Sequence, residues 1–215
     1  MSKQKRNIII STTLITLSIL FTLLVKVVDV QQIGVEETSI GFATINQFVF
    51  KTLRENELWY NITEILGLVA LATVAIYGLI GLTQVIKRKS LLKVDKEIIA
   101  LGIFYVVVIG IYILFEKVIV NYRPVLIDGI KEASYPSSHT LMTTCLCISA
   151  VIINKKLFNN KITKYTNLLL LVIMSTTVIG RLLSGVHWFT DIIGGILIST
   201  ALLTTFYTII SKSNK

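Results

Sequence analysis

The rarest residues of this chain lie close together in the sequence, and their types suit a group-transfer reaction. The 215 residues include two histidines, His139 and His187, and two prolines, Pro124 and Pro136. All four belong to three polar segments, which read RP at 123–124, PSSH at 136–139 and GRLLSGVHWFTD at 180–191. A neutral imidazole is a nucleophile and a protonated one is an acid. Two histidines can therefore divide the two roles of such a reaction.

Arginines and serines accompany the histidines. Arg123 and Arg181 carry forked guanidinium groups, whose paired donors match the oxygens of a phosphate. Ser137 and Ser138 add hydroxyl groups where a helix is expected to begin. The start of a helix also offers free backbone N–H groups and a partial positive charge. These donors favour a phosphoryl group as the bound species.

A carboxylate completes the pattern. Asp191 follows His187 by four residues, which on a helix places both side chains on one face. A carboxylate there can fix the tautomer of the imidazole and stabilise its positive charge. The chain shows no carboxylate cluster suited to magnesium and no Cys/His set suited to zinc. We therefore predict phosphoryl transfer without a metal or other cofactor.

The rest of the chain indicates a membrane protein. Hydrophobic residues make up 53% and charged residues 15%, whereas roughly a quarter of a soluble domain is charged. Six stretches are apolar enough for membrane helices, at about residues 7–28, 62–86, 98–115, 140–154, 165–183 and 190–210. The fourth is short, so we expect it to begin inside the preceding loop. These stretches predict an all-α, polytopic six-helix transmembrane bundle, one domain over 1–215 with its motifs in about 98–210.

Positive residues predict the orientation of this bundle. The N-terminus, residues 87–97, residues 154–165 and the C-terminus hold 14 Lys or Arg, including Lys215, and the alternate connections hold six. Both termini are therefore predicted to be cytoplasmic, and the three polar segments are predicted to meet outside, at the ends of helices three to six. The net charge of +9 reflects basic clusters beside anionic lipid, so nucleic acid is not an expected partner.

Three further features are interpreted from local patterns. The N-terminal apolar run follows basic residues like a signal peptide, but it is long and lacks a cleavage site, so we interpret it as a retained signal anchor. Residues 45–59 mix apolar and charged side chains, which fits either an amphipathic helix at the interface or an ordinary loop. Cys145 and Cys147 lie in an apolar stretch and are interpreted as packing residues.

The three polar segments resemble the signature of the phosphatidic acid phosphatase type 2 superfamily. That signature contains Lys, six residues and Arg-Pro; then Pro-Ser-Gly-His; then Ser-Arg, five residues, His, three residues and Asp. Here Arg123-Pro124 matches the first part, and Pro136 to His139 matches the second except at Ser138. The stretch from Gly180 to Asp191 keeps the spacing of the third. The resemblance covers helices three to six.

This resemblance implies a role for each residue. His187 attacks phosphorus and forms a phosphohistidine, and Asp191 orients His187. His139 protonates the leaving oxygen and then activates water. The phosphoryl oxygens bind to four positions, namely Arg123, Arg181, Ser137 and the backbone near Ser138.

The chain departs from the signature at three positions. Glu116 stands where the family has Lys, and Lys117 comes one residue later, about 100° around a helix. Lys117 is kept as a candidate phosphate ligand. Ser138 replaces Gly, and Gly180 replaces Ser. None of these changes touches the histidines or Asp191, so we expect activity.

The function implied is that of a lipid phosphate or diphosphate phosphatase, multi-pass in the cell membrane with its active site facing outside. Undecaprenyl diphosphate or a phosphatidate-type lipid is the expected substrate, because an outward-facing site meets the diphosphate released on that side. Two alternatives stay open: a lipid phosphotransferase, and a non-catalytic lipid-binding or transport protein on the same scaffold. The sequence does not predict the oligomeric state.

Overall fold

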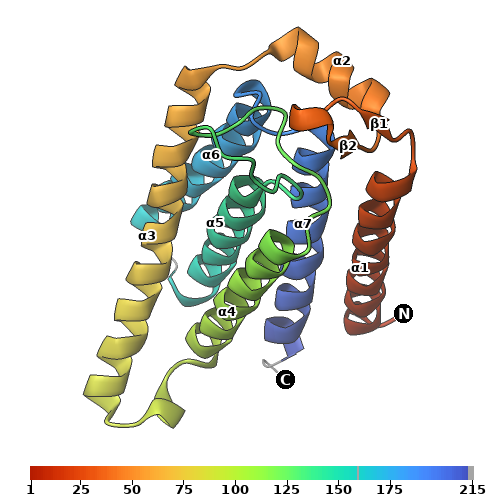
Figure 1. Cartoon of the computed structure of the whole chain (residues 1–215). Helices are drawn as coiled ribbons and strands as arrows, with labels where there is room; N and C mark the ends of the chain where they lie inside the picture. Colours follow the sequence, from red (N-terminus) through yellow and green to blue (C-terminus); the bar gives the residue numbers. More distant parts are fainter. Residues whose placement is uncertain (159, 213–215) are drawn as a thin grey trace.

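The computed structural model describes residues 1–158 and 160–212, which form a bundle of long α-helices (Figure 1). Six of these helices are long and apolar enough to cross a membrane. They are α1 (Lys3–Val27), α3 (Glu57–Arg88), α4 (Lys96–Lys117), α5 (Ser138–Leu157), α6 (Lys161–Leu183) and α7 (Phe189–Lys212). The prediction of an all-α, six-helix transmembrane bundle is confirmed.

Side-chain caps mark where several of these helices begin. The capping oxygens belong to Asn56 before α3, Ser137 before α5 and Asn160 before α6, and each accepts from a backbone N–H three residues on. A cap satisfies an N–H group that has no partner inside the helix. Because Ser137 is the cap, α5 begins at Ser138, two residues earlier than the stretch predicted from apolar residues alone.

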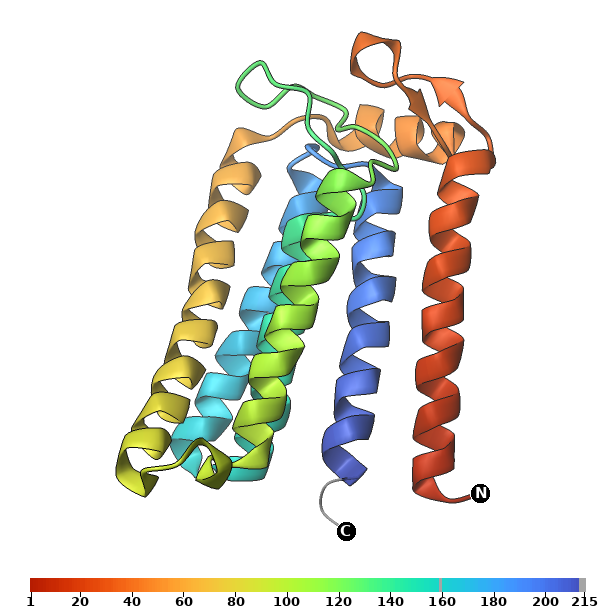
Figure 2. The same cartoon turned by 60° about the horizontal axis from the view of Figure 1, so that its bottom comes forward.

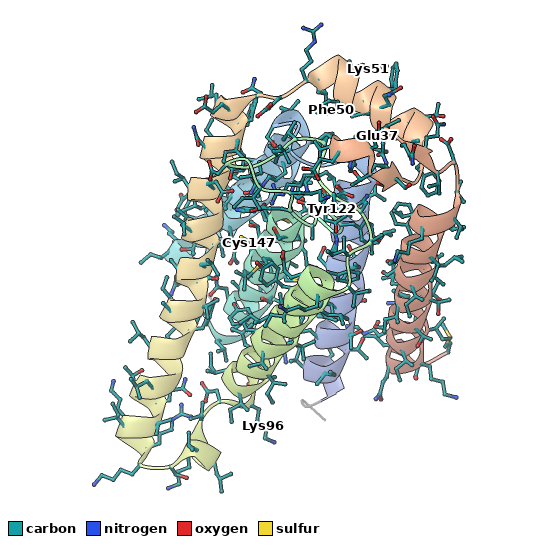
Figure 3. The ribbon with its side chains drawn as sticks, in the orientation of Figure 1. Glu37, Phe50, Lys51, Lys96, Tyr122 and Cys147 are labelled. Atoms are coloured by element: carbon teal, nitrogen blue, oxygen red, sulfur yellow. The ribbon has the colours of Figure 1, made fainter. Side chains whose placement is uncertain are left out.

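Helix α5 lies in the middle of the bundle, with α3, α4, α6 and α7 around it (Figure 1). Of its most apolar stretch 67% is buried inside the protein, against 17% for α1 and for α3. Its polar side chains therefore face other helices rather than lipid, which explains why it is the least apolar span. Cys145 and Cys147 on α5 are buried free thiols, which confirms that they are packing residues (Figure 3).

Helix α1 begins and α7 ends at one end of the bundle (Figure 2). Lys96 lies at this end, whereas Glu37, Lys51 and Tyr122 lie at the other (Figure 3). The start of α1 and the end of α7 thus share a side, as the distribution of Lys and Arg requires. That this side is cytoplasmic remains a prediction, and Lys215, one of the residues counted for it, lies outside the described residues.

The connection between α1 and α3 covers the opposite end of the bundle. A hairpin of β1 (Gln31–Gln32) and β2 (Ser39–Ile40), joined by the 3-10 helix η1 (Val35–Glu37), leads into α2 (Ala43–Leu53). Helix α2 runs across the bundle (Figure 1), while η2 (Leu91–Lys93) joins α3 to α4 at the other end. Of the two interpretations of residues 45–59, a helix is therefore present, but it spans Ala43–Leu53, and residues 57–59 begin α3.

The break between α2 and α3 has a packing cause. After α2, Arg54 takes a positive φ of 57°. The backbone here lies directly against Gly185, where a Cβ atom would come within 2.3 Å of the carbonyl oxygen of Arg54. Asn56 N also donates to the carbonyl oxygen of Ser184 at 3.0 Å. A continuous helix over 45–59 would lose these contacts with the connection 184–188, which carries His187.

Candidate active site

The three polar segments meet at the end of the bundle that α2 covers. Trp188 Nε1 donates to the carbonyl oxygen of Tyr122 at 2.8 Å, which joins the third segment to the first. Ser137 N donates to the carbonyl oxygen of Asp191 at 3.0 Å, which joins the second segment to the third. Residues separated by up to 66 positions in the chain are therefore brought together, as predicted.

His187 lies buried in the connection between α6 and α7, and a serine holds its ring. Ser134 Oγ lies 3.1 Å from Nδ1 of His187, and the same hydroxyl donates to Oδ2 of Asp191. A hydroxyl has one proton, so Ser134 must accept at its other contact. Nδ1 of His187 therefore carries the ring proton, and Nε2 is left with a free lone pair.

Asp191 is fully buried at the start of α7 and accepts several hydrogen bonds. Besides Ser134, its donors are Asn121 Nδ2 at 3.1 Å and Trp188 N at 2.9 Å. Oδ2 of Asp191 lies 3.7 Å from Nδ1 of His187, which is too long for a hydrogen bond. The predicted pairing of His187 with Asp191 is thus close, but the carboxylate reaches the ring through Ser134.

The environment of His187 keeps its ring neutral. Burial lowers the pKa of His187 well below its ordinary value, and the charges of Arg123, Arg181 and His139 lower this pKa further. A neutral imidazole with a free Nε2 is the form that can attack phosphorus.

His139 and Arg181 form a second cluster, and a carboxylate from α3 completes it. Nη2 of Arg181 donates to Oε1 of Glu64 at 2.6 Å and also contacts Nδ1 of His139. The other carboxylate oxygen of Glu64 lies 3.4 Å from Nε2 of His139. Arg181 is fully buried, so this carboxylate balances a charge that lies away from water.

Arg123 approaches the site from the connection after α4. Its Nε lies 3.1 Å from Oε2 of Glu132, and its backbone N donates to the carbonyl oxygen of Glu132 at 3.1 Å. Lys131, next to Glu132, pairs with Glu36 of η1 at 2.7 Å, which holds this connection against the segment between α1 and α3. The position of Arg123 is therefore set by the loop rather than by a helix.

Several buried nitrogens of the site lack a hydrogen-bond partner within the part of the chain that the structure describes. They are Nη1 of Arg123, Nε and Nη1 of Arg181, and Nε2 of His187. A buried polar atom without a partner costs about 1–3 kcal/mol, so native proteins seldom leave one without a functional reason. The arginine donors suit the oxygens of a phosphate, and the histidine nitrogen suits its phosphorus.

The remaining predicted ligands differ in their placement. Ser137 is buried, and its hydroxyl caps α5. Ser138 lines a cavity of about 10 Å³ beside His187, room for about one water molecule. Glu116 lines the same cavity, whereas Lys117 is exposed at the end of α4 and is not among the lining residues. The structure therefore brings Glu116, rather than Lys117, close to His187.

Gly180 explains one departure from the family signature. A Cβ atom at this position would lie 2.6 Å from Cγ2 of Thr63 and 3.0 Å from Cε3 of Trp59. Helix α6 can approach α3 this closely only because residue 180 has no side chain. The same approach brings Glu64, next to Thr63, within reach of Arg181, next to Gly180. Gly180 thus allows α3 to lie close enough for the carboxylate of Glu64 to reach the site.

Sequence reasoning missed three residues of this arrangement: Glu64, Ser134 and Asn121. Glu64 had a signal, because it is the one charged residue in the apolar stretch predicted at 62–86, and an ionisable group inside a span is a functional candidate. Ser134 and Asn121 lie in a connection without periodicity, and nothing in their spacing indicates a contact with Asp191.

The side chains of Arg123 and Arg181 bring positive charge to the site. Over residues 1–158 and 160–212, no three His, Cys, Asp or Glu side chains come together as a metal site requires. The charges that act on the buried His187 belong to Arg123, Arg181 and His139.

Comparisons with known proteins agree on one family. Residues 116–215 match the model of the PAP2 superfamily. The fold is similar to a transmembrane PAP2-type phosphatidylglycerolphosphate phosphatase from Bacillus subtilis, with a TM-score of 0.67 over 94% of this chain and 96% of that one. The two sequences are 17% identical, so this likeness concerns the fold. No curated protein sequence matches the chain significantly.

Proposed function

Because residues 116–215 match the PAP2 superfamily and the described chain has six helices that could cross a membrane, we propose that it is a lipid phosphate or diphosphate phosphatase that forms a phosphohistidine on His187 and needs no metal ion. The observation that carries this function is the buried, unpartnered Nε2 of His187, together with unpartnered buried nitrogens on Arg123 and Arg181, whose charges act on His187.

The first step transfers the phosphoryl group to the enzyme. Nε2 of His187 attacks phosphorus, the bond from phosphorus to the leaving oxygen breaks, and that oxygen takes a proton from His139. The imidazole becomes positively charged as the N–P bond forms. Ser134 and Asp191 stabilise this charge through Nδ1–H, as the carboxylate does in a catalytic triad.

The second step returns the enzyme to its starting state. Water attacks the phosphorus of phosphohistidine, gives a proton to His139, and the N–P bond breaks with its electron pair returning to Nε2. Inorganic phosphate leaves. In both steps negative charge grows on the phosphoryl oxygens, where Arg123, Arg181 and the backbone N–H groups at the start of α5 stabilise it.

A lipid substrate is supported by the surface below the site. An apolar groove of about 750 Å³ runs between α5, α6 and α7, and its lining includes Thr144, Ile179 and Ile196. Thr144 follows His139 by five residues on α5, a rise of about 7.5 Å along the helix. A lipid tail in this groove would place its headgroup at the histidines.

The outward orientation and the substrate are proposed from charge and topology. The Lys and Arg count supports a covered end that faces outside, where undecaprenyl diphosphate is the expected substrate. A phosphatidate-type lipid is the other candidate, and the similar Bacillus subtilis protein is named for a lipid phosphate of this kind. Lys117 stays a candidate ligand only as a prediction, since it is exposed.

The test is phosphate release by the purified protein in detergent micelles. Undecaprenyl diphosphate, phosphatidate and phosphatidylglycerol phosphate are each supplied, with and without EDTA. We expect release from at least one lipid, unchanged by EDTA, and a loss of at least about 100-fold in His187→Gln. Lys51→Ala, on the exposed side of α2, is the control that keeps full activity. Turnover of all three lipids by His187→Gln at the wild-type rate would contradict the phosphohistidine.

A further inference from the structure

Helix α3 contributes one face to the site, although it lies outside the residues that match the family. Tyr60, Glu64 and Gly67 follow the spacing i, i+4 and i+7, which places them in one row along the helix. The guanidinium of Arg181 lies over the ring of Tyr60, 5.2 Å from its centroid. A Cβ atom at Gly67 would lie 2.8 Å from Cδ2 of His139, so this glycine makes room for the imidazole.

Glu64 contacts both Arg181 and His139. Its Oε1 accepts from Nη2 of Arg181 at 2.6 Å, and its Oε2 lies 3.4 Å from Nε2 of His139. The charged groups that act on His139 are Glu64 from α3, Arg181 from α6 and Arg123 from the connection after α4. Glu64 is the one anion among them.

These contacts determine which nitrogen of His139 carries the proton. A guanidinium can only donate, so Nδ1 of His139 must accept from Arg181. The proton of the neutral ring is therefore on Nε2, which faces the carboxylate of Glu64. His187 has the opposite arrangement, with the proton on Nδ1 and a carboxylate behind it. Each histidine thus has one ring nitrogen without a proton and a carboxylate near the other nitrogen.

We propose that Glu64 is a positioning residue for His139, which holds the Nε2–H bond so that Nδ1 exchanges the proton of the reaction. When a phosphoryl oxygen takes the place of Nδ1 at Nη2 of Arg181, Nδ1 is released. The freed Nδ1 takes up a proton from solvent, which makes the ring an imidazolium, and gives this proton to the leaving oxygen in the first step. The ring is then neutral and takes a proton from water in the second step. Glu64 stabilises the imidazolium before the first step and after the second. This role presupposes the phosphohistidine chemistry proposed above.

Glu64→Gln is the informative change, because glutamine keeps the shape and an acceptor oxygen but removes the charge. We compare an alkyl lipid phosphate with 4-nitrophenyl phosphate, whose phenolate leaves without needing a proton. For the lipid we expect kcat to fall about 100-fold, the size of a general acid–base contribution. For the aryl substrate we expect an initial burst of nitrophenolate at nearly the wild-type rate, followed by slow turnover, because water attack still needs His139.

Two controls separate this role from others. Glu57→Gln, at the exposed start of the same helix, should match wild type with both substrates. Glu64→Asp keeps the charge on a shorter side chain, and its loss should be smaller than that of Glu64→Gln and confined to the same steps. It also provides the measurement if Glu64→Gln fails to fold. Equal losses with the two substrates would overturn the role, since a mere counter-ion of Arg181 affects both alike.

Measuring His187→Gln beside Glu64→Gln distinguishes an error about Glu64 from an error about the proposed function. If His187→Gln abolishes the burst and Glu64→Gln behaves as wild type, Glu64 has no positioning role while the phosphohistidine stands. If His187→Gln keeps the burst with 4-nitrophenyl phosphate, the phosphohistidine itself is refuted, and the role of Glu64 with it.

Discussion

Ser134 offers the sharpest test of how Asp191 acts on His187. Its hydroxyl accepts from Nδ1 of His187 and donates to Oδ2 of Asp191, so it links two groups whose direct separation is 3.7 Å. Ser134→Ala removes both hydrogen bonds and leaves the methyl-sized remainder of the side chain. Nδ1–H then has no acceptor within hydrogen-bonding distance, and the charge formed during phosphoryl transfer is stabilised only across the longer gap.

The size of the effect follows from these contacts. A hydrogen bond to a charged group contributes about 1.5–3 kcal/mol, and a buried donor left unpaired costs about 1–3 kcal/mol. Since about 1.4 kcal/mol corresponds to a factor of ten in rate, we expect Ser134→Ala to lower kcat by about 10- to 100-fold. The loss should fall on the formation of phosphohistidine, because that step places the positive charge on His187.

The assay is single-turnover formation of phosphoenzyme with 4-nitrophenyl phosphate, followed by the release of nitrophenolate. Ser199→Ala is the matched control, since Ser199 is also buried but its hydroxyl donates to the carbonyl oxygen of Ile196 within α7. Combining Ser134→Ala with Asp191→Ala should cost less than the sum of the single losses, because both belong to one chain of contacts. Full activity of Ser134→Ala would refute the reasoning, and would mean that Asp191 reaches the ring directly.

Three more outcomes are expected. The lowered pKa of His187 means that below about pH 6.5 the unfolded chain takes up a proton that the folded site refuses. Stability should therefore fall as pH falls, by at most about 1.4 kcal/mol per pH unit from this residue, and the drop in Tm from pH 7 to 5 should be smaller in His187→Gln. Glu116→Gln should lower KM about fivefold, since it removes from the cavity wall a negative charge whose repulsion of phosphate is worth about 1 kcal/mol. Lys117→Ala should leave KM unchanged. A large rise in KM for Lys117→Ala would instead identify Lys117 as a phosphate ligand. Ile196→Trp, in the apolar groove, should raise KM about tenfold for long-chain lipid phosphates but not for 4-nitrophenyl phosphate. Equal effects on both substrates would refute binding of the lipid tail in this groove.

The sequence alone was sufficient for the properties that depend on local composition. The six spans follow from apolar length, because a helix in lipid must satisfy its own backbone and present apolar side chains. The convergence of the segments around Arg123, His139 and His187 followed from counting helices, since alternate connections return to the same end. Residue spacing placed Asp191 near His187, although His187 lies in the connection before α7 and the two residues do not share a helix.

Contacts between distant segments decided the rest. Glu64 and Arg181 are 117 residues apart, and Ser134 and Asp191 are 57 apart, so no local period could pair them. The break between α2 and α3 likewise depends on Gly185, far along the chain. From its sequence this protein could be assigned its spans and a set of candidate residues for phosphate chemistry. Packing of α3, α5, α6 and the loop at Ser134 decided which nitrogen of each histidine carries the proton and which carboxylate lies near it. Proton positions depend on the partners that each ring meets in space, and the sequence does not give these partners.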